Sequence, residues 1–121
     1  MSQKNALLAL AGKRVYDTVD CPEPIGKVLM RTLTTAESIT CANYQFDDSG
    51  KPVPGREKYT TAKRLSYAIV DADKNPMFDE ENIEEMANWP ETLTNALSRK
   101  YWEMASADYV EAFLKNVAPA A

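Results

Sequence analysis

The sequence predicts a mainly α-helical fold of four to five short helices, with a small β-hairpin near the N-terminus. From residue 34 onward, apolar residues recur at three- and four-residue spacing, which lines one face of a helix. Before that point, two short runs of β-prone residues flank a loop that contains proline and glycine. At 121 residues we expect one domain, 1–121, made of an N-terminal arm (1–12), a hairpin (about 13–33) and a helical body (about 34–117) with one flexible loop (about 47–58).

The arm carries three leucines in a short stretch of helix-forming residues. Asn5 is a candidate helix cap, and Gly12 lies where a left-handed stop belongs. Leu7, Leu8 and Leu10 do not share one narrow stripe. We therefore expect the arm either to be loose, as chain ends usually are, or to dock on a partner.

The hairpin is predicted from Lys13–Asp20 and Lys27–Leu33, which flank a Pro- and Gly-containing connection. An isolated hairpin is only marginally stable, so this one must pack on the helices. The first helix of the body begins at Thr34, because a glutamate three residues later, Glu37, completes a capping box. It is expected to run to about Phe46.

A helix, a tight acidic turn and a second helix are predicted between Tyr59 and Asn88. The first helix is expected to reach Ala72, because apolar residues keep helical spacing up to that point. Pro76 then disfavours helical geometry at the residue before it. Asp79 is the expected cap of the second helix, and Phe78 and Ile83 have the spacing of a hydrophobic staple.

The acidic turn partly matches the pattern of an EF-hand calcium loop. Four of its residues match ligand positions of an EF-hand: Asp71, Asp73, Asn75 and Asp79. Pro76, however, stands where the loop needs glycine, and Asn82 stands where a bidentate carboxylate closes the shell. We therefore expect a capped structural turn and no metal.

Two further helices complete the predicted body. One is expected to be capped by Asn88, to begin at Pro90 and to carry an apolar stripe through Met104. The last opens at Ser106 or Asp108 and continues through about residue 117. Such stripes are far more often core than cofactor site.

Composition excludes several classes of function. The net charge of −4 argues against a nucleic-acid surface, which needs clustered basic residues. The sequence has no apolar run long enough for a membrane span. Cys21 and Cys41 lack metal-site or redox spacing, so we expect buried thiols in a reducing cytosol, although spacing alone leaves a disulfide open.

We expect no enzyme and no cofactor. The absence of histidine removes the commonest general base and the nucleophile arrangements that depend on it. The four glycines are loop glycines and form no phosphate-binding loop. Neighbouring glutamates such as Glu80 and Glu84 are interpreted as a solvated helix face, since catalytic carboxylates need a concave apolar setting. Binding is the class that remains.

The candidate partner-binding residues lie at the two ends of the chain. They are apolar or aromatic, the types that dominate interfaces: Leu7, Leu8, Leu10, Trp102, Tyr109, Phe113 and Leu114. The alternative is that the C-terminal members of this set simply close the core.

Two motifs resemble one family. Val28–Glu37, VLMRTLTTAE, is similar to a strand and capped helix of the tail assembly chaperones of long-tailed bacteriophages, of the lambdoid and siphophage type. Ala68–Ile83, AIVDADKNPMFDEENI, resembles a second segment of that family. The chain departs from the pattern at Pro76, where a glycine turn is commoner, and at Asn82, where an acidic residue is usual. The resemblance covers about residues 6–105.

The resemblance implies a small assembly protein in the host cytoplasm that binds the phage tape measure protein, keeps it soluble and is absent from the finished tail. It also implies a longer, frameshifted form whose C-terminal extension recruits the tail tube protein, and we add self-association as an expectation from exposed apolar surface. The alternatives are a non-catalytic head–tail connector, another phage interaction module, or an enzyme whose site the sequence does not reveal.

Overall fold

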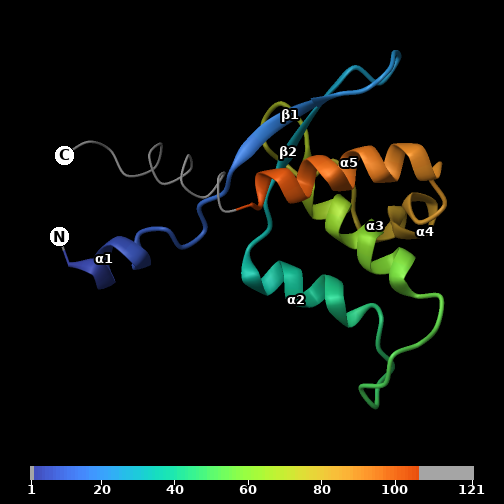
Figure 1. The fold of residues 1–121 in the computed structure, drawn as a ribbon, viewed down its shortest axis with the longest axis horizontal. Helices are drawn as coiled ribbons and strands as arrows, with labels where there is room; N and C mark the ends of the chain where they lie inside the picture. Colours follow the sequence, from blue (N-terminus) through green and yellow to red (C-terminus); the bar gives the residue numbers. More distant parts are fainter. Residues whose placement is uncertain (1, 107–121) are drawn as a thin grey trace.

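The structure is a computed structural model, and it describes residues 2–106 (Figure 1). Within them the chain is mainly α-helical with a small antiparallel sheet, which confirms the predicted fold class. The elements follow in the order α1 (Gln3–Leu8), β1 (Tyr16–Asp20), β2 (Lys27–Arg31), α2 (Thr35–Asn43), α3 (Glu57–Ala68), β3 (Ile69–Val70), the 3₁₀-helix η1 (Glu80–Asn82), α4 (Ile83–Met86) and α5 (Glu91–Met104). The predicted last helix lies outside the described residues.

The hairpin is confirmed. β1 and β2 pair antiparallel, with Tyr16 opposite Arg31 and Asp20 opposite Lys27. A third strand, β3, pairs with the other edge of β2, so that the sheet order is β1-β2-β3.

The prediction that the central helix runs to Ala72 was wrong. α3 ends at Ala68, and the next residue, Ile69, is already extended at φ −86° and ψ 123°. Ile69 and Val70 are β-branched, and pairing with β2 leaves them only 2% and 1% exposed. A non-local strand partner thus overrides the helical spacing of these residues.

The core lies where α3 and α5 pack on the sheet (Figure 1). Met30 of β2 and Met104 of α5 have no exposed surface, and Leu65 of α3 is 1% exposed. Other buried members come from the same elements and from α4: Ala62, Ala68, Ile69, Ile83, Met86, Leu97 and Tyr101. This is the amphipathic packing that the helical stripes predict.

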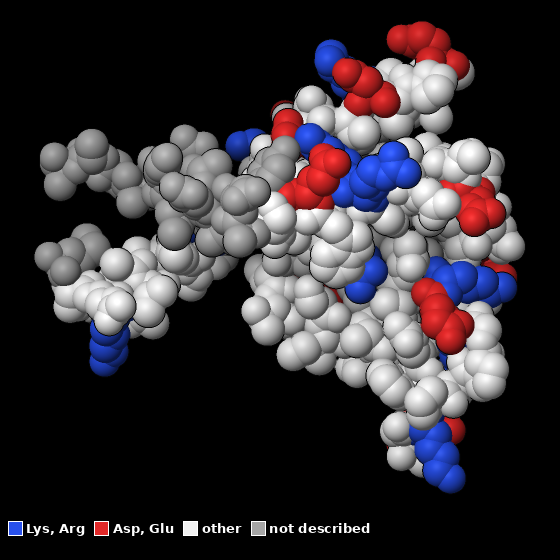
Figure 2. All heavy atoms as spheres, in the orientation of Figure 1, with Lys and Arg blue, Asp and Glu red and all other residues white. Residues whose placement is uncertain are grey.

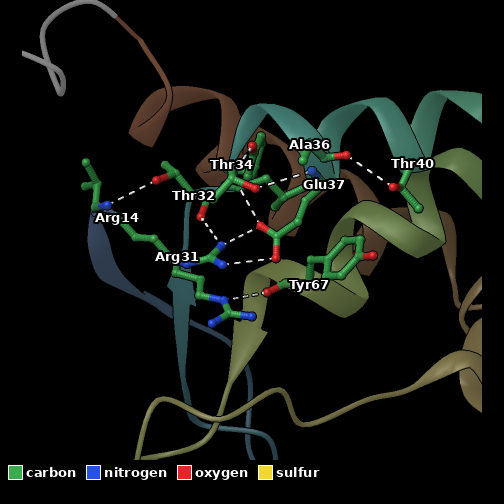
Figure 3. A network of polar contacts seen from close by, with 11 residues as sticks. Arg14, Arg31, Thr32, Thr34, Ala36, Glu37, Thr40 and Tyr67 are labelled. Atoms are coloured by element: carbon green, nitrogen blue, oxygen red, sulfur yellow. Dashed lines mark hydrogen bonds and ion pairs between the residues drawn. The ribbon is translucent and has the colours of Figure 1, made fainter. Parts of the chain in front are cut away.

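A polar network fixes the base of the hairpin to α2 and α3 (Figure 3). The capping box is confirmed, because Thr34 and Glu37 each accept a hydrogen bond from the other's backbone amide. The Arg14 guanidinium donates to both Glu37 carboxylate oxygens, at 2.6 and 3.0 Å, and to the Thr32 carbonyl at 3.0 Å. Arg31 Nε donates to the Tyr67 carbonyl at 2.8 Å.

This network sets the protonation of Glu37. Burial alone raises the pKa of the Glu37 carboxyl, but the hydrogen bonds from Arg14 and from the Thr34 amide outweigh it and hold that pKa below its ordinary value. The same ion pair raises the pKa of Arg14. The Glu37 carboxyl is therefore ionised in the folded protein at neutral pH.

The acidic turn is closed by its own backbone. The Asp71 carboxylate accepts from the amides of Asp73 and Asn75, at 2.9 and 3.0 Å. Lys74 takes the left-handed conformation at φ 67°. Asp79 caps the next helix as predicted, although its first turn, η1, is 3₁₀ rather than α.

Two predicted caps were wrong. Ser2, not Asn5, caps α1, because Ser2 Oγ accepts from the Asn5 amide at 3.1 Å. Asn88 does not cap α5. Its side-chain amide donates back to the Glu84 carbonyl at 2.8 Å and so closes α4, while α5 begins after Pro90 without a side-chain cap.

The cysteines are free thiols, and Cys41 is fully buried as expected, but the expectation was wrong for Cys21, which is partly exposed. Burial raises the pKa of the Cys41 thiol. None of the helices within residues 2–106 has the length and apolarity to cross a membrane.

Candidate partner-binding surfaces

The arm exposes its leucines. α1 has no buried residue, and Leu7 and Leu8 are 64% and 62% exposed. Leu10 follows the helix and is half-buried. Figure 1 shows α1 projecting away from the helices and sheet of the body. The arm therefore offers apolar side chains that the described body does not cover.

Trp102 lies on the surface of α5. It is 56% exposed, with the Arg64 guanidinium 4.9 Å from the centroid of its ring. The Tyr101 ring lies nearly perpendicular to it, with the two ring centroids 5.1 Å apart. A hollow of about 330 Å³ adjoins it, lined largely by polar side chains of α3 and α5, such as Thr61, Asn95 and Ser98. The other C-terminal candidates, Tyr109, Phe113 and Leu114, lie outside the described residues, so the choice between a lid on the core and a binding surface stays a prediction.

An apolar groove of about 370 Å³ lies between β2, β3 and the first half of α5. We call it the sheet groove. Its lining residues come from the hairpin loop, both strands, the acidic turn and α5: Ile25, Lys27, Val28, Leu29, Ile69, Val70, Asp71, Ala72, Met77, Phe78, Leu93 and Leu97. Its two exposed large apolar residues are Ile25 (51%) and Met77 (53%).

The local sequence explains why these two residues are exposed. Ile25 belongs to a tight loop that Gly26 closes at φ 71°, with the Cys21 amide donating to the Gly26 carbonyl at 2.9 Å. Met77 follows Pro76, and its amide donates to the Ile69 carbonyl at 3.2 Å. Both backbones are held in place, and each large apolar side chain is left half in solvent.

The chain segment that follows β3 is rich in acidic residues. Between residues 71 and 91 there are eight of the chain's 18 acidic residues and one basic residue, Lys74. The Lys74 ammonium lies over the Tyr16 ring at 4.5 Å. Glu80 accepts from Lys63 at 2.9 Å and from the Tyr44 hydroxyl, and these bonds lower the pKa of its carboxyl. Other carboxylates of this stretch, including Asp73 and Glu91, are exposed.

The outer face of α2 carries no charge. Its single charged residue, Glu37, turns inward to Arg14, while Ile39 is 58% exposed. In Figure 2 the area over α2 is white, whereas red and blue groups lie close together over α5 and α3. This face is the fourth place where the described residues expose apolar side chains.

The sequence pattern found the arm and Trp102 but missed the sheet groove. The groove is assembled from segments up to seventy residues apart, from Ile25 to Leu97, and needs β3, which the helical spacing concealed. One signal was present in the sequence. Ile25 and Met77 are large apolar residues within loops that otherwise carry proline, glycine and acidic residues.

No family model and no curated protein matches this sequence. Among solved structures, the bacteriophage HK97 tail assembly chaperone is similar, with a TM-score of 0.62 and 22% sequence identity. The likeness covers 87% of this chain and 100% of that chain. At this identity, what the two chains share is the fold.

Proposed function

We propose that this protein is a bacteriophage tail assembly chaperone that binds the tape measure protein and keeps it soluble during tail morphogenesis. The observation that carries the proposal is the likeness of fold to the HK97 tail assembly chaperone over the whole of that chain. The two sequence motifs that resemble the tail assembly chaperone family support the same assignment.

The exposed apolar side chains suit such a role. A chaperone of a long, helix-rich client needs apolar surface that its own fold leaves uncovered. The arm, the sheet groove and Trp102 supply it at three places on the described residues. The same surface favours self-association, which we include in the proposal.

In this proposal the protein works in the host cytoplasm by binding alone, without catalysis or cofactor, and is absent from the mature virion. A longer, frameshifted form would recruit the tail tube protein through its C-terminal extension. A head–tail connector differs in one respect, since it stays in the virion. Mass spectrometry of purified virions therefore separates the two roles, and recovery of this chain at stoichiometric level would refute the chaperone role.

The test is co-expression with the tape measure protein of the same phage. We expect that protein to be insoluble alone and to be soluble and co-purified in the presence of this chain. Leu7→Asp with Leu8→Asp should weaken the effect without unfolding the body, because neither side chain is buried. Gln3→Asp with Lys4→Asp is the matched control on the same exposed helix. An insoluble tape measure protein with the wild-type chain would refute the proposal.

A further inference from the structure

We propose that the sheet groove binds an amphipathic helix of a partner, with a few apolar side chains in the groove and lysine or arginine on the flank that faces the acidic turn of Asp71 and Asp73. The identity of the partner rests on the proposed function, where it would be the tape measure protein. The chemistry of the groove stands on its own residues.

The first argument is the shape and lining of the groove. Its volume of about 370 Å³ lies at the lower end of the range of roughly 300–1,000 Å³ that is usual for binding pockets. It includes the buried residues Ile69, Val70 and Leu97, and its exposed large apolar residues are Ile25 and Met77. Such a groove matches two or three apolar side chains spaced along one face of a helix.

The second argument is the flexible side chain that the groove leaves in solvent. Met77 is unbranched, polarizable and 53% exposed, and methionine adapts well to irregular apolar partners. Its backbone is held by the Ile69 carbonyl at 3.2 Å, so only the side chain has to adjust when a partner binds. An ordered backbone keeps the entropy cost of binding low.

The third argument is charge. Asp71 lines the groove and Asp73 is exposed in the same turn, whereas Lys74 of that turn lies with its ammonium over the Tyr16 ring at 4.5 Å. Lys27, on the other side, is engaged by Asp20 at 2.8 Å. Carboxylates beside an apolar groove favour a partner with basic residues and disfavour nucleic acid and anionic lipid, both of which carry negative charge.

The probe is a labelled 18-residue synthetic peptide with leucines on one helical face and lysines on both flanks. Binding to the full-length protein is measured by fluorescence anisotropy. We expect Met77→Asp to weaken binding at least about tenfold, as loss of a central interface contact does. Ile39→Asp is the matched control, because Ile39 is equally exposed but lies on α2. Met77→Gln is a milder second variant, and the far-UV circular dichroism of each variant checks that it is folded.

Charge is tested separately. A peptide with glutamate in place of every lysine should bind at least about tenfold more weakly, and Asp73→Asn should reduce the salt dependence of binding. Equal binding of the lysine and glutamate peptides would overturn the charge assignment. Equal loss in Met77→Asp and Ile39→Asp would overturn the groove as the site, as would full binding by both Met77 variants.

Failure of the peptide-binding experiment can be distinguished from failure of the co-expression experiment that tests the proposed function. A wild-type protein that binds the peptide but leaves the tape measure protein insoluble would refute the chaperone role alone. A protein that keeps the tape measure protein soluble but does not bind the lysine peptide would refute the groove assignment alone.

Discussion

Phe78 joins the acidic turn to the rest of the fold, and replacing it with alanine tests that junction. Its ring packs on the core and meets Trp89 edge-on, with ring centroids 5.5 Å apart and planes at 73°. A fully buried phenylalanine costs about 3–5 kcal/mol on truncation to alanine. Because Phe78 is only partly buried, we expect a loss of about 2–3 kcal/mol, of which about 0.5–1.5 kcal/mol belongs to the aromatic pair.

The assay is urea unfolding of the wild type and Phe78→Ala, followed by circular dichroism. Phe46→Ala is the matched control, because Phe46 is 40% exposed and should lose less than about 1 kcal/mol. A double-mutant cycle with Trp89→Leu isolates the ring–ring contribution. If Phe78→Ala costs no more than Phe46→Ala, the junction between the acidic turn and α4 is wrongly described.

Three further predictions concern the arm, α2 and its ion pair. Thr34→Ala removes the cap of α2 and should cost about 1 kcal/mol of unfolding free energy, whereas an unchanged urea midpoint would contradict the capping box. The pKa of Glu37 is lowered in the fold, so its stabilisation is present above the ordinary carboxyl pKa and is lost as pH falls through the folded value. Glu37→Gln should therefore flatten the acid side of a stability–pH curve measured by urea unfolding, and an unaltered curve would contradict the role of Arg14. Leu7→Asp with Leu8→Asp should leave the melting temperature of the body unchanged while reducing the solubility of co-expressed tape measure protein, and a large fall in melting temperature would show that the arm is structural.

The parts of the fold that were predictable are those whose cause is local. Thr34 and Glu37 form a capping box within one helical turn, and the hairpin strands flank a loop of six residues, Cys21 to Gly26. In both cases the residues that make up the sequence motif are the same residues that form the local structure. The Asp71 turn is of the same kind, because its carboxylate bonds to amides two and four residues later.

The parts that were not predictable depend on distant partners. Ile69 and Val70 continue a helical spacing, and only the free edge of β2, some forty residues earlier, makes them a strand. The sheet groove could not be predicted for the same reason, since β2 and β3 form two of its walls. Asn88 shows a subtler failure. It stands two residues before Pro90, after which α5 begins, but its side-chain amide instead donates to the Glu84 carbonyl of the preceding helix, α4.

α3 passes into β3 without an intervening loop, since Ile69 is at once the residue that ends the helix and the first residue of the strand. A helix advances about 100° per residue and a strand reverses its side-chain direction at every residue. One residue inserted after Ala68 would therefore rotate the helix against its neighbours or reverse both faces of the strand, and no slack in the chain would absorb the change. The rotation of α3 about its axis and the register of β3 against β2 therefore cannot change independently. We expect insertions and deletions to be tolerated least at this junction.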